Sequence, residues 1–318
     1  MRIHRNIPSV ADTPVALSIG NFDGVHLGHQ CILRRLKDAA AERGLPACVM
    51  TFEPHPREFF APDQAPPRLT SLREKLELLE GHGVDRVYLC RFNFDFARVS
   101  AEDFINRILV SGLGVRWILL GDDFRFGARR AGDRAMLRTA AREWGFEVTE
   151  MPSVDVDGLR VSSTAVRTYL AEGRLDAAAR FLGRPYSMSG RVVRGDQIGR
   201  KLGFPTANVQ MKHNRPPLSG VFVAQVHGLH GGPHAGAASL GVRPTVAGDG
   251  TPTLEIHLLD FDADIYGAHV QVEFLELLRE ERKYADLNAL TRQIGLDVKQ
   301  ARAWFTLRNK KRALSRNG

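Results

Sequence analysis

Short apolar segments alternate with amphipathic segments through the first half of the chain. Apolar residues recur at helical spacing in residues 30–43, where they fall on one face and stop before Gly44, a residue type that commonly ends helices. Strands and helices in strict alternation predict a parallel sheet that is covered by helices on both faces. The segments that we predict as its strands are residues 15–19, 47–52, 84–90, 115–120 and 146–151.

The pattern changes after residue 173. A short helical segment at residues 176–181 is followed by Gly183 and Pro185, which are typical of a linker. Short alternating segments then follow one another, separated by glycine-rich turns, which predicts a closed or nearly closed antiparallel barrel. Its predicted strands are residues 188–193, 221–226, 254–259 and 270–275.

Helical periodicity returns near the end of the chain, in residues 287–294 and 298–305, and we expect these helices to pack on the barrel. The length of 318 residues suits two cores, and 43% hydrophobic with 25% charged residues is ordinary for a globular protein. We therefore predict an α/β domain at residues 1–182, followed by a β-barrel domain with terminal helices at residues 183–318.

Cysteine content and hydrophobicity indicate the cellular compartment of the protein. Cys31, Cys48 and Cys90 lack the spacing of metal ligands, and their odd number favours free thiols in a reducing compartment. We therefore expect a cytoplasmic protein. The sequence contains neither a signal-peptide pattern nor a run of about 18 apolar residues, so we expect no membrane partner.

The net charge of +8 favours polyanions or phosphorylated small molecules as ligands. The arginine-rich segments are scattered, and the dense basic run is the tail at residues 308–318. Proteins that bind single-stranded nucleic acid combine basic with aromatic side chains, but no aromatic residue lies among the charges of this tail. We interpret this tail as a solvated surface.

The motif GNFDGVHLGH, which begins at Gly20, directly follows the first predicted strand. A strand that leads through a glycine-containing turn into a helix aims backbone N–H groups and the positive helix end at an anion above the turn. Gly28 leaves room near such an anion, and His26 and His29 can donate hydrogen bonds to phosphate oxygens. Two surface histidines at a helix start are the alternative interpretation.

A second cluster that suits phosphate is VSSTAVR at residues 161–167. Ser162, Ser163 and Thr164 can cap a helix. Arg167 follows one turn later, so that N–H groups and a guanidinium can face a polyphosphate, with a plain helix cap as the alternative. This segment comes after the last predicted strand of the sheet and can return to the carboxyl edge, where open α/β sheets bind ligands.

The loop GDDFRFG at residues 121–127 follows the fourth predicted strand. A planar ring can stack on Phe124 or Phe126, and charged side chains of the same loop, Asp123 among them, can hydrogen-bond the edge of that ring. TFEPHP at residues 51–56 ends the second predicted strand in a comparable way. A plain turn is the alternative for both loops.

In the second half, GRKLGFPTAN at residues 199–208 is a glycine-rich stretch that does not match the P-loop pattern of nucleotide-binding proteins. Thr206 and Asn208 are two residues apart, so an extended segment puts both side-chain oxygens on one face. There they can share a magnesium ion that also holds nucleotide phosphates. A turn stabilised by Pro205 and Asn208 is the alternative.

Residues 253–259 alternate between apolar and polar side chains, which places Glu255 and His257 together on the polar face of a strand. Glu255 can act as a general base toward a substrate hydroxyl, with a merely solvated glutamate as the alternative. His257 has no metal-ligand partners in the sequence, and we do not predict that it binds a metal.

These motifs, in this order, resemble those of the prokaryotic bifunctional riboflavin kinase/FMN adenylyltransferase (FAD synthetase) family over nearly the whole chain. The likeness rests on GNFDGVHLGH, TFEPHP, GDDFRFG and VSSTAVR in the first half, and on GRKLGFPTAN, GVRPT and LEIHLLDF followed by IYG in the second. The resemblance implies a Rossmann-like nucleotidyltransferase domain of the HxGH type and a six-stranded riboflavin kinase barrel. Together they would convert riboflavin to FMN and FMN to FAD with ATP.

For the first domain, the resemblance implies adenylyl transfer. His26 and His29 would steady the ATP phosphates while the FMN phosphate attacks the α-phosphorus, with release of pyrophosphate and without a covalent enzyme intermediate. The nucleotide contacts that it implies come from Gly20, Asn21, Phe22, Asp23, Gly28, Asp123, Phe124, Ser162, Ser163, Thr164 and Arg167.

For the second domain, the resemblance implies that Thr206 and Asn208 ligate Mg²⁺ on ATP. Glu255 would accept the proton of the riboflavin ribityl 5′-hydroxyl as that oxygen attacks the γ-phosphorus. Arg279, in LLREERKY, is expected to help hold the flavin, whereas Ser239 stands where an asparagine often precedes the IG pair. The further ATP contacts that the resemblance implies are Gly199, Lys201, Gly203 and Pro205.

Two other function classes stay open at this point. A nucleotidyltransferase-fold protein with an RNA-binding barrel draws support from the basic tail, but Phe222, Tyr266 and Phe274 form no clear surface row of aromatic residues. A non-catalytic, flavin-responsive regulator would not need the intact His26 and Glu255. We therefore expect small-molecule substrates, no nucleic-acid partner, and a monomer or a transient oligomer.

Overall fold

The structure is a computed structural model that describes residues 1–195, 199, 202–242 and 252–314. The chain forms two compact units: unit 1 comprises residues 1–66 and 72–162, and unit 2 comprises residues 67–71 and 163–318. Helices α7 (Ser163–Ala171) and α8 (Leu175–Leu182), which we predicted in the first domain, belong to unit 2. A domain boundary at residue 182 stays a prediction.

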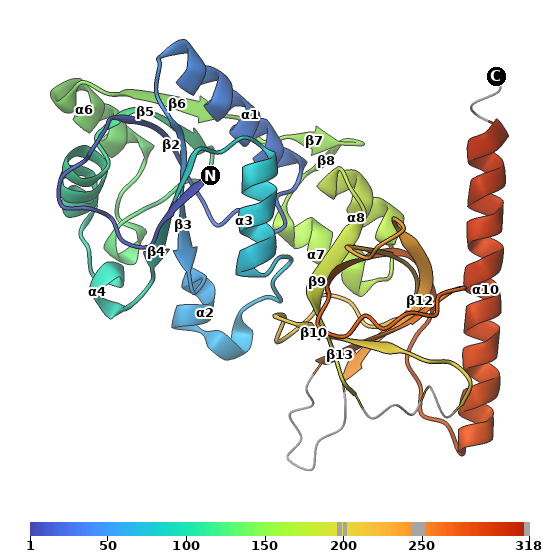
Figure 1. The fold of residues 1–318 in the computed structure, drawn as a ribbon. Helices are drawn as coiled ribbons and strands as arrows, with labels where there is room; N and C mark the ends of the chain where they lie inside the picture. The colour runs from blue at the N-terminus through green and yellow to red at the C-terminus, as the bar shows by residue number, and fades with distance from the viewer. Residues whose placement is uncertain (196–198, 200–201, 243–251, 315–318) are drawn as a thin grey trace. The chain divides into compact units, whose positions relative to one another are not determined.

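Unit 1 is built on a parallel sheet of six strands in the order β1-β4-β3-β2-β5-β6 (Figure 1). The five strands predicted from the apolar segments are all present. β1 is an additional edge strand that pairs with β4, and its sequence, RIH, is too short and too polar for the hydrophobic pattern to predict it. The strands are β1 (Arg2–His4), β2 (Val15–Ile19), β3 (Ala47–Glu53), β4 (Arg86–Arg91), β5 (Val115–Gly121) and β6 (Glu147–Met151).

Helices cover both faces of this sheet, because successive residues of its strands point to opposite sides. Leu17 belongs to the apolar cluster that includes Leu109 of the π-helical segment η2, whereas Ala16 belongs to the cluster that includes Leu36 of α1. The remaining elements of unit 1 are α1 (Leu27–Glu42), α2 (Pro56–Phe60), η1 (Pro62–Gln64), α3 (Leu72–Gly81), α4 (Phe94–Ala97), α5 (Ala101–Asp103), η2 (Phe104–Gly112), η3 (Ala128–Arg130), α6 (Arg134–Trp144), β7 (Asp155–Val156) and β8 (Leu159–Arg160).

The strand order brings two of the predicted loops to one place. β2 and β5 are neighbours in the sheet, yet the chain continues from β2 to β3 on one side and from β5 to β6 on the other. Open α/β sheets bind ligands at such a switch point, beyond the carboxyl ends of the strands. The loops that follow these two strands are GNFDGVHLGH and GDDFRFG.

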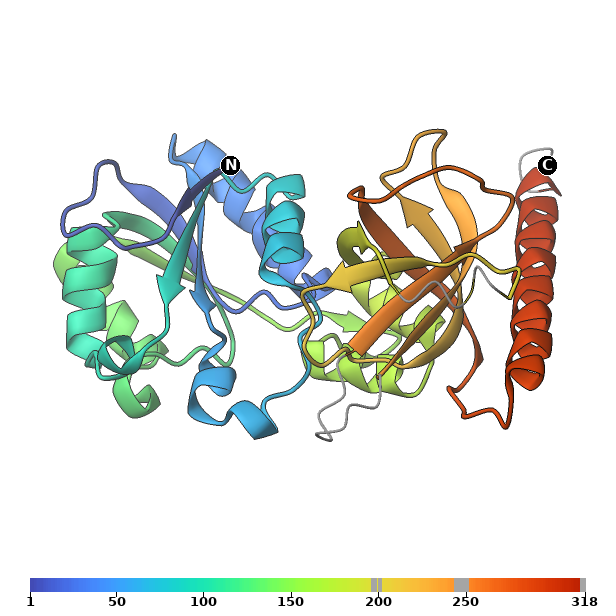
Figure 2. The ribbon, with the colours of Figure 1, turned by 60° about the horizontal axis from the view of Figure 1, so that its bottom comes forward.

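Unit 2 contains a closed antiparallel barrel, which confirms the predicted barrel (Figure 2). Its strand order is β10-β13-β12-β11-β14-β9. β10 and β12 have no counterpart among the strands predicted from the pattern, since β10 is short and β12 consists largely of small residues. The strands are β9 (Tyr186–Val193), β10 (Ala207–Met211), β11 (Gly220–His227), β12 (His234–Val242), β13 (Pro252–Leu258) and β14 (His269–Arg279).

One long helix, α10 (Leu287–Leu314), replaces the two helices that we predicted at the end of the chain, so that prediction was wrong. Gly295 lies between the two predicted segments, but a single glycine costs a helix only about 1 kcal/mol. Burial of Val298 and Ala301 against Val223 and Ala237 of the barrel outweighs that cost. Each helix in the described part of the chain is too short or too polar to cross a bilayer.

Candidate functional sites

The turn between β2 and α1 has an unusual backbone. Phe22, Gly24 and Val25 have φ angles of 48°, 81° and 40°. Positive φ is ordinary for glycine but costs a bulky or β-branched residue on the order of 1–3 kcal/mol. The side chains of Phe22 and Val25 are fully buried, which offsets that cost and holds the turn in this conformation. The strained turn presents Asn21, Asp23 and His26 at the end of the sheet.

His26 is the N-cap of α1, and its Nδ1 accepts a hydrogen bond from the backbone N–H of His29 at 3.4 Å. Because Nδ1 accepts, the ring proton lies on Nε2, which can donate to a ligand. The rings of His26 and His29 stack with centroids 3.7 Å apart. A Cβ on Gly28 would lie 3.2 Å from His26 Nδ1, so the glycine leaves room for this ring.

Two buried polar atoms beside this turn have no hydrogen-bond partner among the residues that the structure describes: Asn21 Oδ1 and His29 Nδ1. Burial, and then the charges of His26 and Lys75, hold the pKa of His29 well below its ordinary value. The ring is therefore neutral at neutral pH and has one N–H to donate. Buried polar atoms are nearly always paired in folded proteins, so these two are available to hydrogen-bond a ligand.

Lys75 of α3 is a residue that we did not predict in this site. Its side chain is only 4% exposed, and its charge acts on His29. A buried ammonium beside the histidines suits a polyanion such as a polyphosphate. The spacing to Leu79, one helical turn later on the buried side of α3, is the sequence signal that could have revealed it.

The loop after β5 is held by an acidic residue. Asp122 accepts hydrogen bonds from Ser153 Oγ at 2.7 Å and from the Arg160 guanidinium at 3.0 Å, and the Ser153 hydrogen bond, followed by the Arg160 charge, lowers the pKa of Asp122. Asp123 is exposed and Phe124 is half-buried. The prediction that Phe126 offers a stacking surface was wrong, because Phe126 is buried in the core.

A cluster of phenylalanines lies where β3 and β4 end, at the same edge of the sheet. Neighbouring rings have centroids 4.8 to 5.9 Å apart. Phe60 and Phe94 are 67% and 70% exposed, which is a large apolar surface to leave in water. We did not predict this cluster, although FF at 59–60 and FNFDF at 92–96 are visible in the sequence. Its members are Phe52, Phe59, Phe60, Phe92, Phe94 and Phe96.

The VSSTAVR segment crosses from one unit to the other. Val161 lies in unit 1, with its carbonyl oxygen 3.8 Å from where a Cβ on Gly28 would stand, so the segment passes beside the first turn of α1. α7 begins at Ser163, so Ser163 and Thr164 lie in its first turn and do not precede the helix as we predicted. Arg167 Nε donates to the carbonyl of Pro67 at 2.6 Å within unit 2. Contacts from Ser162 through Arg167 to a nucleotide in unit 1 stay predictions.

The barrel brings together the two residues that we predicted for phosphoryl transfer. Asn208 on β10 is the register partner of Glu255 on β13, and Ser239 on β12 is the partner of Glu255 on its other side. Directly opposed residues on neighbouring strands have their Cβ atoms about 5 Å apart on one face of the sheet. Leu254 and Ile256 point into the core while Glu255 does not, as the alternation predicts.

Two glycines and a histidine contact residues 205–208, which we call the PTAN segment, beside this face of the barrel. A Cβ on Gly195 would overlap the Asn208 side chain, and a Cβ on Gly199 would lie 3.1 Å from Thr206 Oγ1. His257 Nδ1 is hydrogen-bonded to the carbonyl of Pro205 at 2.9 Å, so it supports the loop rather than a metal. Gly203 adopts a positive φ of 84°. Of the remaining predicted contacts, Lys201 lies outside the described residues.

Arg279 has its contacts in the last helix. Its Nε and Nη2 donate to the carboxylate of Asp297 at 3.0 and 2.8 Å, and its Nη1 donates to the carbonyl of Glu280. Asp297 is only 3% exposed, so this ion pair anchors α10 to the end of β14. A contact between Arg279 and the flavin stays a prediction.

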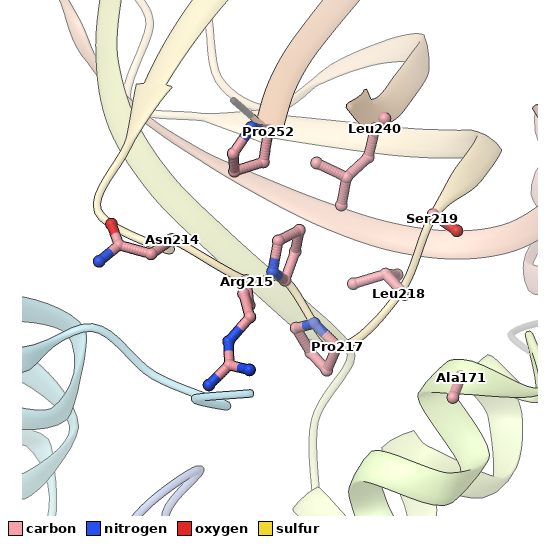
Figure 3. Close-up of a pocket in the computed structure, with 10 residues that line it drawn as sticks. Ala171, Asn214, Arg215, Pro217, Leu218, Ser219, Leu240 and Pro252 are labelled. Carbon is pink, nitrogen blue, oxygen red and sulfur yellow. The ribbon is translucent and has the colours of Figure 1, made fainter. Parts of the chain in front are cut away.

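A separate pocket of about 390 Å³ in unit 2 contains none of the predicted site residues (Figure 3). Apolar side chains such as Leu218 and Pro252 line it, with Asn214 and Arg215 at one side. Leu240, also in its lining, follows Ser239 on β12 and is buried, so it points to the opposite side of the strand from Ser239 and Glu255. Gly241, the next residue of the lining, lies on the Glu255 side of the strand, but the residues that we predicted for phosphoryl transfer do not line this pocket.

Comparisons with known proteins find two families that match successive parts of the chain. The family model described as FAD synthetase matches residues 9–165, and the one described as riboflavin kinase matches residues 182–305. A bifunctional riboflavin kinase/FMN adenylyltransferase of Pseudomonas fluorescens is 51% identical over 286 residues, which is 90% of this chain and 91% of that protein. The chain belongs to the bifunctional riboflavin kinase/FMN adenylyltransferase family.

Another member of this family, from Escherichia coli K12, is 46% identical over 310 residues, covering 96% of this chain and 99% of that protein. A crystal structure from Streptococcus pneumoniae, described as a macrolide-efflux protein, superposes with a TM-score of 0.82 at 29% identity. It covers 96% of this chain and 100% of that one. The likeness of fold therefore extends over both units of the riboflavin kinase/FMN adenylyltransferase chain.

Proposed function

We propose that this protein makes FAD from riboflavin in two ATP-dependent steps, one in each unit. Riboflavin is phosphorylated to FMN on the barrel of unit 2, and FMN is adenylylated to FAD at the carboxyl edge of the sheet in unit 1. The observation that carries the proposal is the register pairing of Asn208 with Glu255, which puts an oxygen ligand for a metal–nucleotide beside a carboxylate base. The two families matched along the chain support the same division.

In unit 1, the loop at residues 20–29 binds the triphosphate of ATP and aligns its α-phosphorus with a phosphate oxygen of FMN. That oxygen forms a bond to the α-phosphorus while the bond to the bridging oxygen of the β-phosphate breaks, and pyrophosphate leaves. His26 and His29 donate their ring N–H groups to the oxygens that gain charge, and Lys75 adds a buried positive charge. The FMN phosphate is already ionised, so the step requires no general base.

The phenylalanine cluster supplies the apolar surface that a flavin ring needs. Phe60 and Phe94 expose ring faces at the sheet edge where the phosphate-binding loop lies, within unit 1. A tricyclic aromatic ring that stacks there gains both burial and offset ring contacts. The half-buried Phe124 and the exposed Asp123, in the loop that follows β5, are the residues that we propose contact the nucleotide base.

In unit 2, Glu255 accepts the proton of the ribityl 5′-hydroxyl as that oxygen attacks the γ-phosphorus of ATP, and ADP leaves in line. The carboxylate lies on the outer face of β13, beside Asn208, so the hydroxyl and the triphosphate meet over neighbouring strands. Gly199, Gly203 and Pro205 give the loop its close approach to the phosphates. Lys201 is proposed as a further phosphate contact on its sequence position alone.

Thr206 and Asn208 fit a magnesium ion. Their side chains offer a hydroxyl and an amide oxygen, which are hard ligands, and the neighbouring glycines keep bulky side chains away from both. Within the described residues no cluster of three or more His, Cys, Asp or Glu side chains could hold a metal, which suits an ion that takes most of its ligands from phosphates and water. Bound there, Mg²⁺ would neutralise charge on the ATP phosphates.

The partners that we propose are small molecules: riboflavin, FMN and ATP. An RNA-binding barrel finds no support in the families matched. We propose that the protein works in the cytoplasm, without nucleic acid or membrane as a partner, as a monomer or a transient oligomer.

Radiolabelled ATP tests the proposal, because the two steps cut the triphosphate at different phosphorus atoms. With riboflavin, Mg²⁺ and ATP labelled at the γ-phosphorus, FMN becomes labelled. With ATP labelled at the α-phosphorus, FMN stays unlabelled and only FAD carries the label. Absence of both flavin nucleotides would contradict the proposal, and RNA binding without flavin products would favour the RNA-binding alternative.

A further inference from the structure

Glu281, in the segment between β14 and α10, lies against the outer face of β12. Ser239 Oγ donates a hydrogen bond to Glu281 Oε1 at 2.8 Å. The Glu281 carboxylate also fills the space above Gly241, so that a Cβ on this glycine would overlap it. Ser239 and Gly241 are two residues apart on one strand, so both contacts occur on the same face.

This face is the one that carries the proposed base. Ser239 is the register partner of Glu255, and Gly241 is the partner of Thr253, the residue two before Glu255. The Glu281 carboxylate therefore rests over the strand beside Glu255, on the side away from Asn208 and the proposed nucleotide phosphates.

The segment that carries Glu281 is fixed at both of its ends. Arg279, at its start, is paired with Asp297 of α10. Arg282 donates hydrogen bonds to Tyr284 and to Gln293, again on α10. The helix thus holds the flanks of the segment, whereas Glu281 is its hydrogen-bonded attachment to the barrel strand beside Glu255.

We propose that Glu281 is a positioning residue for riboflavin phosphorylation. Its contact with Ser239 and Gly241 holds residues 280–284 beside Glu255, where they form the wall of the site that receives riboflavin. The inference rests on the proposed kinase function and adds a role for three residues. A preformed wall removes the cost of ordering the segment when riboflavin binds, so loss of the contact raises KM for riboflavin. KM for ATP stays unchanged, because the nucleotide binds on the Asn208 side.

Three substitutions break the contact from three different positions: Ser239→Ala removes the donor, Glu281→Ala removes the acceptor, and Gly241→Ala displaces the carboxylate. We expect each to raise KM for riboflavin about five- to tenfold, which lies in the range for the net contribution of one ordinary intramolecular hydrogen bond. KM for ATP and the rate of FMN adenylylation in unit 1 should stay within about twofold. Ser239→Thr and Glu281→Gln keep a donor and an acceptor, and we expect them to behave like the wild type.

Gly295→Ala in α10 is the matched glycine control, since among the described residues its new Cβ would meet Phe204 Cζ alone, at an ordinary 3.6 Å. The double variant Gly241→Ala/Glu281→Ala separates the proposed role from damage to the barrel. If the carboxylate is the target, Gly241→Ala has no further effect once Glu281 is alanine. If Gly241→Ala raises KM for riboflavin as much in the Glu281→Ala background as in the wild type, its effect arises in the barrel, and the inference is overturned.

The inference would also be overturned if the wild-type protein forms FMN but Ser239→Ala and Glu281→Ala do not change KM for riboflavin. That result would leave the kinase function intact. A wild-type protein that forms no FMN would instead contradict the proposed function. Because Glu281 is exposed, these variants remain informative even if Gly241→Ala does not fold.

Discussion

Asn208 and Glu255 lie directly opposite each other on neighbouring strands of the barrel, on its outer face. Strand β10 thus carries Asn208, whose side chain suits a metal ion, and the adjacent strand β13 carries Glu255, whose side chain suits proton acceptance. The barrel needs no deep cleft to bring them together, because strand register alone fixes their separation.

Substitution of Asn208 tests the metal side of this pair. Asn208→Ala should lower the rate of FMN formation from riboflavin at least about tenfold and raise the Mg²⁺ concentration that gives half of the maximal rate. Gln210→Ala, two residues further on the same face of β10, is the control and should have little effect. Kinase assays over a range of Mg²⁺ concentrations check this. An unchanged Mg²⁺ dependence in Asn208→Ala would rule out its role as a ligand.

Gly28 tests the histidine arrangement in unit 1. In Gly28→Ala the new Cβ would press on the His26 imidazole, which must then shift from its stacked position on His29. We expect FMN adenylylation to fall about tenfold, because a small misplacement of a positioned group is costly in catalysis. Riboflavin phosphorylation should not change. Gly81→Ala in α3 is the control, since no atom of the described residues lies within 4 Å of its new Cβ. Equal losses in the two variants would argue against the His26 explanation.

The depressed pKa of His29 makes stability depend on pH. A histidine whose pKa is lower in the folded state takes up a proton on unfolding, so its contribution is present above the unfolded pKa and lost below about pH 6.5. The free energy of unfolding should therefore fall as pH drops from about 7 to about 5.5, and less steeply in His29→Asn. Denaturant unfolding at several pH values measures both slopes. Parallel slopes would mean that His29 does not titrate as we expect.

Much of the fold follows from the sequence pattern, and the exceptions have physical reasons. The strands of unit 1 are nearly continuous apolar runs because the parallel sheet is buried on both faces. β12, by contrast, reads HAGAASLGV, and its small residues carry little hydrophobic signal. The continuity of α10 was missed because the helix is stabilised across Gly295 by burial against the barrel, which the helix sequence alone does not reveal.

Some residues of the candidate sites can likewise be predicted from the sequence, and others cannot. Motifs that depend on local backbone, such as the turn before His26, can be recognised from glycine spacing. Lys75 and Glu281 escaped notice because their roles depend on what packs against them from distant parts of the chain. Ser239 was noticed only as a departure from the family pattern, and its hydrogen bond to Glu281 gives it a contact that no spacing argument supplies.

The buried thiols offer a check on the core of unit 1. Burial raises the pKa of Cys48 and of Cys90 to about 12, so neither forms the reactive thiolate at mildly alkaline pH. Iodoacetamide at about pH 8 should leave both unmodified in the native protein and modify them after denaturation. Mass spectrometry of the tryptic peptides distinguishes the sites. Rapid modification of Cys48 or Cys90 in the folded protein would contradict their placement in the sheet.

The central claim is that two separate sites, one in each unit, carry out the two reactions, and chromatography of flavins after incubation with ATP and Mg²⁺ tests it most directly. Glu255→Gln, which cannot accept the hydroxyl proton, should form no FMN from riboflavin yet convert added FMN to FAD at the wild-type rate. His29→Ala should do the reverse, so that riboflavin is converted to FMN and FMN accumulates. Loss of both activities in either correctly folded variant would contradict the account.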